Sequence, residues 1–340
     1  MKKQLFVTTF CSLLLAGYGC SSPQANDAVQ DLTQYVDPYI GSGGHGHVFV
    51  GANVPYGLVQ LGPSSIPQEW DWTSGYHISD STVIGFPHMH LSGTGIGDLH
   101  DITLMPVTGE VTYARGVESD QTSGLWSYSD RSKEVVKPGY YATHLLRYDV
   151  DVELTATKRV GFHKYTFNQN ENAAVVFDLQ NGGCWDSPTK AYINKVGEKT
   201  IEGYRYSSGW ATDQRVFFVA EFSEPITSLD VIVDRGEAVA DKGEGKIIYA
   251  RANVDAQKPV YVKVALSPTS IENAKLNMQT ELPGWDFEGT IAQADQAWEK
   301  ALAKVEMESA DPKSKKIFYT ALYHTMVAPS EFCDVNGDYY

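Results

Sequence analysis

The chain has few cysteines and lacks the short motifs that mark several common enzyme classes. Its 340 residues contain four cysteines, too few for the disulfide framework of a small secreted domain. No HExxH, CxxC, GxSxG or phosphate-loop pattern occurs. These absences argue against the zinc proteases, dithiol oxidoreductases, serine hydrolases and nucleotide-binding enzymes that carry such motifs.

Basic residues are also scarce relative to acidic ones. The sequence holds 27 Lys and Arg against 42 Asp and Glu. All 42 acidic residues and 25 of the basic ones follow residue 20, so that part carries a net charge of −17. Nucleic acid and anionic lipid surfaces are therefore not expected as partners.

The N-terminus has the pattern of an export signal. Lys2 and Lys3 precede an apolar run that ends in small residues and Cys20. The run is short for a membrane span and no stop-transfer pattern follows. We expect a lipoprotein signal peptide over 1–20, lipidation of Cys20 and a polar tether over 21–33. Membrane contact would then occur only through the lipid anchor, in the periplasm or at the outer membrane of a Gram-negative bacterium.

One alternative is ordinary signal cleavage that releases a soluble periplasmic protein, because Gly17 stands where lipoprotein signals commonly carry Leu. Once the leader and Cys20 are set aside, Cys184 and Cys333 are left. They could pair in an oxidising compartment, but two buried free thiols are the favoured interpretation.

Hydrophobic patterning predicts a β domain followed by helices. A Gly- and His-rich block covers about 34–111, and alternating segments such as 173–179 and 216–222 run to about residue 267. No helical pattern separates these segments, which favours an antiparallel β-sandwich over a parallel α/β sheet. We place the sandwich at 34–268.

Helical spacing begins after Pro268. Residues 269–274 have the pattern of a capped helix start, and a second helix is expected from Phe287 to Met307. We assign 269–310 to linker helices. A third helix should present one apolar stripe and end before Pro329; the stripe consists of Ile317, Phe318, Ala321, Leu322 and Met326.

Six of the nine histidines lie between residues 45 and 100. The segment 41–47 is so rich in glycine that its backbone must adopt positive φ or approach another group closely. It is either a tight turn or a loop that lines a ligand pocket, with Gly43, Gly44 and His45 as binding candidates. On an extended strand, the pairs His45/His47 and His88/His90 would each place both rings on one face, which is a possible zinc-ligand spacing. No carboxylate or cysteine at a recognised offset accompanies them, so core histidines are favoured.

Two further segments have compositions suited to sugar binding. Trp70 and Trp72 flank Asp71 close to small polar residues, which suits stacking on a sugar ring, although tryptophans in a sandwich are more often core. The segment 334–338 has the start of a calcium loop without the rest of its spacing. A turn that directs Asp334 at a pocket is favoured.

The chain resembles glycoside hydrolase family 92, a family of bacterial exo-acting α-mannosidases. The resemblance spans the chain after the leader and is carried by 35–47, 51–57, 74–77, 85–95, 138–141, 153–163, 209–211 and 318–325. Pro87 stands where the family more often has Ser. The order of so many unusual segments identifies the family better than any one of them.

The resemblance implies a two-domain enzyme with a β-sandwich, linker helices and an (α/α)6 barrel, of which 311–340 would be the start. It implies calcium-dependent, inverting removal of terminal mannose from glycans, by a general acid and a general base. The catalytic residues and calcium ligands would lie beyond residue 340, so the chain is expected to be inactive alone. Gly43, Gly44, His45, Trp70, Trp72 and Asp334 would contact the sugar.

A different class of function is a carbohydrate-binding lipoprotein without catalysis. Such a self-contained module should not end in an apolar helical stripe with nothing to pack against. A third possibility is an inert scaffold, in which the loss of Asp334 would leave turnover of the complete protein unchanged.

Overall fold

The computed structural model describes residues 31–340. The expected signal peptide, Cys20 and most of the expected tether lie outside the described residues. Within the described part, none of the helices is long and apolar enough to cross a bilayer. Cys184 and Cys333 are both free, as favoured, but each is half-buried and not buried as predicted.

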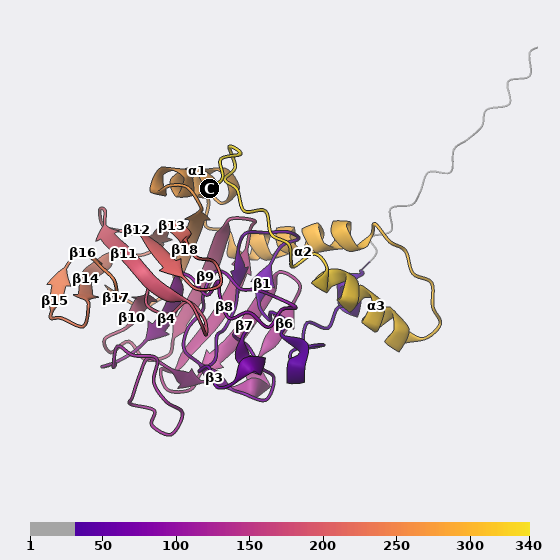
Figure 1. Cartoon of the computed structure of the whole chain (residues 1–340), viewed down its shortest axis with the longest axis horizontal. Helices are drawn as coiled ribbons and strands as arrows, with labels where there is room; N and C mark the ends of the chain where they lie inside the picture. The colour runs from indigo at the N-terminus through magenta and orange to yellow at the C-terminus, as the bar shows by residue number, and fades with distance from the viewer. Residues whose placement is uncertain (1–30) are drawn as a thin grey trace, which may run out of the picture. The chain divides into compact units, whose positions relative to one another are not determined.

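Two large antiparallel sheets dominate the fold (Figure 1). The nine-stranded sheet has the order β16 (Lys242–Gly245), β11 (Ser187–Lys195), β12 (Thr200–Ser208), β13 (Gln214–Phe222), β18 (Val260–Ser267), β9 (Val160–Phe167), β8 (Val150–Ala156), β7 (Tyr140–Leu145) and β6 (Val135–Lys137). The five-stranded sheet has the order β15 (Ala238–Ala240), β14 (Ile226–Val233), β17 (Ile248–Val254), β10 (Ala174–Asp178) and β4 (Thr103–Val107).

The main core lies between these two sheets. Strand β12 alternates strictly between half-buried and buried positions, as expected when one face of a strand packs inward. The ring of Phe177 from the five-stranded sheet lies 6.0 Å from Phe218 and 6.2 Å from Phe222 of the nine-stranded sheet. The sheets therefore pack face to face, and the predicted antiparallel sandwich is confirmed.

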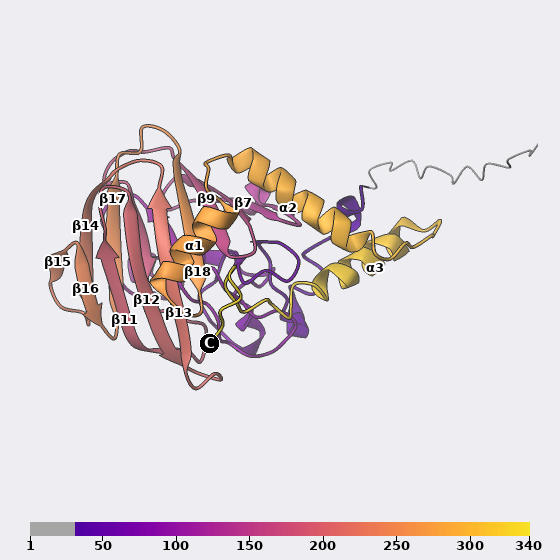
Figure 2. The same cartoon turned by 90° about the horizontal axis from the view of Figure 1, so that it is seen from above.

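Helix α1 (Ile271–Glu281) covers the other face of the nine-stranded sheet (Figure 2). The Ser270 hydroxyl accepts a hydrogen bond from the backbone N–H of Asn273, which confirms the predicted cap. Ala274 and Met278 pack on Phe162 and on its neighbours in β13 and β18. Both faces of β18 are consequently buried, which explains its nearly continuous apolar sequence.

Helices α2 (Phe287–Leu302) and α3 (Pro312–His324) pack with the N-terminal segment in a second cluster. The indole N–H of Trp298 donates to the carbonyl oxygen of Asn53 over 2.7 Å. Glu299 accepts hydrogen bonds from the backbone N–H groups of Leu32 over 3.0 Å and Thr33 over 2.6 Å. These contacts join chain segments far apart in sequence.

The predicted stripe of the third helix is only partly right, because Phe318, Leu322 and Met326 pack in the second cluster, whereas Ile317 and Ala321 are exposed. The buried residues of α3 are Tyr319, Thr320 and Tyr323, whereas Ile317 is 53% exposed. Because Tyr319 and Tyr323 pack in the same cluster as Trp298, the helix does have a partner within the chain. Aromatic rings carry more apolar area than Ile or Ala, so they determine which face turns inward.

The Gly- and His-rich block contains mostly loops and very short elements. Only β4 joins a large sheet, while β1 (Ala52–Asn53) pairs with β2 (Gln60–Leu61) and β3 (Thr82–Val83) pairs with β5 (Ser127–Tyr128). The 3-10 turns are η1 (Thr33–Tyr35), η2 (Gly44–Gly46), η3 (Trp70–Trp72) and η4 (Arg131–Lys133).

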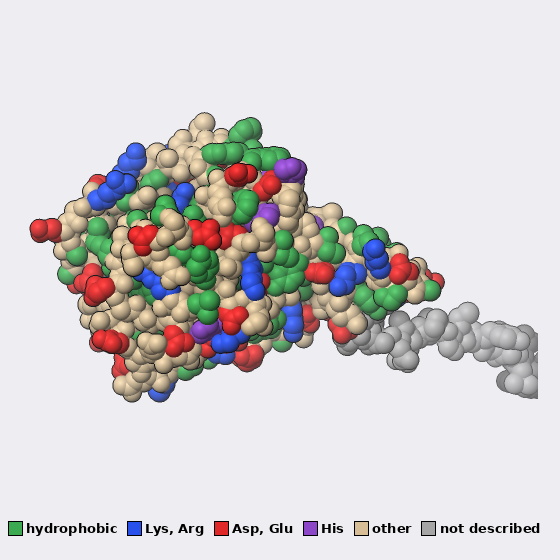
Figure 3. Space-filling view, turned by 90° about the horizontal axis from the view of Figure 1, so that it is seen from below, with side chains coloured by type: hydrophobic (Ala, Val, Ile, Leu, Met, Phe, Trp, Pro, Cys, Tyr) green, Lys and Arg blue, Asp and Glu red, His purple; other side chains and the backbone are tan. Residues whose placement is uncertain are grey.

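Acidic and basic side chains are interspersed over the face shown in Figure 3. Among the ion pairs of the described residues, Lys164 contacts Glu153 over 2.7 Å and Lys316 contacts Asp37 over 3.2 Å. Such surface pairs contribute little to stability. They do offset part of the net negative charge locally.

Candidate functional site

The glycine-rich loop 41–47 folds back on itself. Gly44 has φ +55°, and a Cβ added at Gly46 would collide with the carbonyl oxygen of Gly41. The loop ends at His47, which has a left-handed φ of 52°, uncommon for a residue with a side chain. The predicted need for positive φ and close backbone approach is confirmed. Beyond the loop, the backbone N–H of Gly93 donates to the carbonyl oxygen of His47 over 2.7 Å.

Trp70 lies against this loop. Its ring meets that of His47 edge-on at 4.2 Å and that of His45 at 5.5 Å. Its indole N–H donates to the carbonyl oxygen of Gly95 over 3.0 Å. The residue is 52% exposed, so it is not a core tryptophan. It lines a cavity of about 350 Å³ together with Pro67, Gln68, Glu69, Thr73, Cys184 and Trp185.

Trp72 has different contacts from Trp70. Its indole N–H donates to Oδ2 of Asp80 over 2.7 Å, and its ring stacks on His77 at 4.3 Å. The side chain is half-buried. These contacts hold the turn η3 in place. The predicted contact of Trp72 with sugar stays a prediction.

Asp71 reaches both histidines of the loop. Its Oδ1 lies 2.6 Å from Nδ1 of His45 and 3.9 Å from Nε2 of His47. The side chain of His45 is 78% exposed, whereas that of His47 is buried. Nδ1 of His47 lies 2.9 Å from the hydroxyl of Thr73, and its Nε2 has no hydrogen-bond partner. Burial lowers the pKa of His47 below its ordinary value, which favours the neutral ring.

The second histidine pair belongs to the core. Nε2 of His88 lies 2.8 Å from Nε2 of His163, and Nδ1 of His90 lies 2.8 Å from the carbonyl oxygen of Gln60. Burial lowers the pKa of both His88 and His90 to about 4. Neither residue is in a strand, so the premise of one shared strand face is wrong, while the core interpretation is confirmed for this pair.

Asp334 lies elsewhere, in a turn against α1. Its backbone N–H donates to the carbonyl oxygen of Asp338 over 2.8 Å, so the predicted turn is present. The carboxylate is buried and accepts hydrogen bonds from Ser267, Thr269, Asn273 and Asn277. These contacts orient Asp334 toward the chain itself. A direct bond to a sugar would require it to exchange one of these donors, and that role stays a prediction.

The described residues do not fit calcium. Among residues 31–340, one group of at least three His, Cys, Asp or Glu side chains places its ligand atoms within 4.8 Å of one another, and it consists of His45, His47 and Asp71. Calcium takes six to eight oxygen ligands, whereas this group offers two imidazole nitrogens and one carboxylate. The calcium implied by the family resemblance has no site of this kind here.

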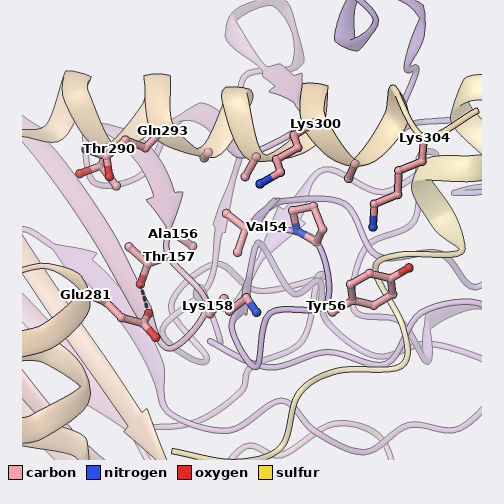
Figure 4. Close-up of a pocket in the computed structure, with 14 residues that line it drawn as sticks. Val54, Tyr56, Ala156, Thr157, Lys158, Glu281, Thr290, Gln293, Lys300 and Lys304 are labelled. Atoms are coloured by element: carbon pink, nitrogen blue, oxygen red, sulfur yellow. Dashed lines mark hydrogen bonds between the residues drawn. The ribbon is translucent and has the colours of Figure 1, made fainter. Parts of the chain in front are cut away.

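A larger groove lies along α2 (Figure 4). It has a volume of about 510 Å³ and is lined by α2, by the turn after β1, by the turn between β8 and β9, and by the last residue of α1. Lys158, Lys300 and Lys304 are at its wall, and the hydroxyl of Thr157 donates to Glu281 over 2.6 Å. None of the site residues predicted from the sequence lines this groove.

Solved structures resemble the whole described chain. An α-mannosidase of Bacteroides thetaiotaomicron, solved in complex with mannoimidazole, is 34% identical over 91% of this chain with a TM-score of 0.86. An inverting mannosidase of the same bacterium shares the fold at 22% identity, 91% coverage and a TM-score of 0.75. This chain spans 42% of each of those chains.

A curated relative extends the comparison to a fungus. An uncharacterized secreted glycosidase of Arthroderma benhamiae is 23% identical over 90% of this chain, which corresponds to 43% of that protein. Residues 35–267 match the glycosyl hydrolase family 92 N-terminal domain, and residues 273–340 match the catalytic domain of the same family. The two matches cover nearly all of the described residues in the expected order, and the chain therefore belongs to glycoside hydrolase family 92.

Proposed function

We propose that this chain is part of an α-mannosidase that removes terminal mannose from glycans. The observation that carries the proposal is the 34% identity, with a TM-score of 0.86, to the α-mannosidase bound to mannoimidazole. Identity at this level over 91% of the chain supports a shared substrate class better than a shared fold would.

The glycine-rich loop and Trp70 form the sugar-facing surface in this proposal. The exposed indole offers an apolar face for a pyranose ring, and His45 with Asp71 offers polar groups beside it. A Cβ at Gly44 would meet nothing within 4 Å, so this part of the loop borders open space. Gly43 and Trp72 would hold the loop and the turn that carry this surface.

Catalysis needs groups that we assign to the remainder of the protein. An inverting mechanism uses two carboxyl groups, roughly 6.5–9.5 Å apart, one as general acid and one as general base for a water molecule. We place this pair, and the calcium ligands, in the part of the mannosidase relatives that has no counterpart in these 340 residues. The described residues would then form one wall of the pocket and would not hydrolyse the glycosidic bond alone.

We also propose that the protein is exported and anchored by a lipid on Cys20. The charged start, the apolar run and Cys20 support this placement. A mannosidase at a Gram-negative cell surface or in the periplasm would meet glycans before they enter the cell.

The test begins with the DNA after the codon for Tyr340. The complete reading frame and the 340-residue chain are assayed for release of mannose from α-mannosides. Mannose release by the complete protein and none by the 340-residue chain is expected. Release by the 340-residue chain alone would contradict the placement of the catalytic pair.

Matched substrates test the substrate class separately. The complete protein should release mannose from an aryl α-mannoside and leave the corresponding α-glucoside and β-mannoside intact. If the protein hydrolysed the α-glucoside faster than the α-mannoside, glucose would replace mannose as the proposed substrate sugar. Binding of mannosides without hydrolysis by a folded complete protein would favour the carbohydrate-binding alternative.

A further inference from the structure

His45, His47 and Asp71 form a cluster whose metal-binding capacity the mannosidase proposal does not use. The three ligand atoms lie within 4.8 Å of one another, although Asp71 is 24 residues or more from either histidine in sequence. The residues come from two short turns, η2 with its C-terminal residue and η3, which pack together. The tertiary structure thus supplies the carboxylate that the sequence spacing lacked.

The strongest sign of an absent ligand is Nε2 of His47. This atom is buried and has no hydrogen-bond partner, in a residue that is only 5% exposed. A buried polar atom without a partner is unfavourable, so native structures rarely retain one without a reason. The nearest carboxylate oxygen, Oδ1 of Asp71, is 3.9 Å away, too far for a hydrogen bond and suitable for a shared ion.

We propose that His45, His47 and Asp71 bind one Zn²⁺ ion. Two imidazole nitrogens with one carboxylate oxygen match the ligands that zinc accepts in tetrahedral sites that keep one position open. The exposed side of His45 leaves room for water or a ligand hydroxyl at that fourth position. The inference concerns metal binding and does not depend on the identity of the sugar.

Only small movements are needed to close the site. Tetrahedral zinc with bonds of about 2.0–2.1 Å to nitrogen and oxygen separates its ligand atoms by roughly 3.3 Å. The His45–Asp71 distance of 2.6 Å would lengthen and the His47–Asp71 distance of 3.9 Å would shorten by comparable amounts. The exposed ring of His45 can turn freely, because little packs against it apart from Trp70.

Thr73 prepares His47 for this role. When the Nδ1–H of His47 donates to the Thr73 hydroxyl over 2.9 Å, the unprotonated Nε2 faces Asp71. Metal-binding histidines are generally oriented by such a bond at the second ring nitrogen. The edge-on contact with Trp70 at 4.2 Å holds the ring in place.

The experiment measures zinc binding by the 340-residue chain. The protein is stripped with a chelator and titrated with zinc chloride in a calorimeter, and zinc is counted after dialysis. Cobalt then replaces zinc, because tetrahedral Co²⁺ has a strong visible absorption that reports the geometry. One zinc per chain and a tetrahedral cobalt spectrum are expected. No saturable binding, or an octahedral cobalt spectrum, would overturn the proposal.

Two variants remove ligands with little risk to folding. His45→Ala changes an exposed side chain, and Asp71→Asn keeps its shape. Each should weaken zinc binding by at least about tenfold, with an unchanged circular dichroism spectrum. Thr73→Val should weaken it by about 10- to 100-fold while it leaves all three ligands in place.

Matched controls test whether another site binds the zinc. His144 also contacts a carboxylate, with Nδ1 at 2.7 Å from Asp151, and Cys184 is a free thiol beside the Trp70 cavity. His144→Ala and Cys184→Ser should bind zinc like the unmodified chain. The proposal is overturned if either control loses the metal, or if His45→Ala and Asp71→Asn both retain full affinity.

Discussion

The side-chain amide of Asn277 donates a hydrogen bond to Oδ1 of Asp334 over 2.7 Å, and both residues are buried. The same amide nitrogen also donates to the carbonyl oxygen of Leu266 over 2.8 Å. Asn277 therefore links three parts of the chain: α1, the end of β18 and the C-terminal turn. A carboxylate that accepts several such bonds is held tightly in one orientation.

Asp334→Ala should destabilise the protein by roughly 3 kcal/mol, because it leaves several buried donors without an acceptor. Urea unfolding at neutral pH measures the effect. Asp338→Ala is the matched control, because this residue lies in the same turn and is exposed. Its cost should stay below about 1 kcal/mol. Equal, small costs for both variants would refute the structural role of Asp334.

The predicted sugar contact of Asp334 has a separate readout. Asp334→Asn preserves the size of the side chain and one acceptor oxygen. If the carboxylate contacts sugar, this variant of the complete protein should bind mannoimidazole more weakly. The loss of affinity should exceed what the smaller fraction of folded protein explains. A folded variant with full affinity would limit Asp334 to the support of the turn.

Trp70→Ala should separate ligand binding from stability. Because Trp70 is 52% exposed, its removal should lower the free energy of unfolding by only about 1 kcal/mol. In the complete protein, the loss of its apolar face should reduce affinity for mannoimidazole about tenfold, which calorimetry can measure.

The control for this comparison is Trp298, which is fully buried in the cluster that joins α2 and α3. Trp298→Ala should cost about 3–5 kcal/mol of stability. If Trp70→Ala lowered the free energy of unfolding more than Trp298→Ala does, the main role of Trp70 would be packing.

The buried histidines should make stability depend on pH. Burial lowers the pKa of His90 from 6.5 to about 4, so the unfolded chain binds a proton between these values and the folded chain does not. The contribution of His90 is thus complete above pH 6.5 and is lost as pH falls toward 4. Between pH 7 and pH 5 it amounts to roughly 2 kcal/mol.

The comparison of His90→Gln with the unmodified chain isolates this contribution. Urea unfolding at pH 7 and pH 5 should show a smaller loss of stability on acidification in the variant. Buried groups that His90 does not affect, such as Asp101, titrate in both proteins and cancel in the difference. An identical pH dependence in both proteins would mean that His90 is not held neutral.

Cys20→Ala should abolish attachment to the membrane if the N-terminus is a lipoprotein signal. Incorporation of labelled palmitate and release of the protein into the soluble fraction measure this outcome. Cys184→Ala should retain the lipid. Labelling that persists in Cys20→Ala would place the lipid elsewhere, and no labelling of the unmodified chain would favour ordinary signal cleavage.

Much of the fold follows from local patterns in the sequence. The strand predicted at 216–222, the cap at Ser270 and the glycine-rich loop depend on neighbours within a few residues, and all three have the expected structure. Part of the buried face of α3 does not follow from such a pattern. Its buried face depends on Trp298 and Phe49, which come from distant segments, and this partner decides that Tyr319 and Tyr323 turn inward.

In the candidate site, too, some features were visible in the sequence and others depend on the tertiary structure. The density of glycine and histidine in the loop and the two tryptophans were visible in the sequence, as were the ordered segments that identify the family. By itself the sequence therefore determined the β-sandwich, the order of strands before helices and the family. These depend on short-range periodicity and on residue identity, which need no knowledge of distant contacts.

Only the tertiary structure decided that Asp71 meets His45 and His47 and that Asp334 turns toward Asn277. Both contacts join residues 24 or more positions apart, in turns whose directions are set by packing on the rest of the domain. A carboxylate has the same local signature whether it faces a ligand, an imidazole or an amide. Its chemistry is defined by the groups that the fold brings to it.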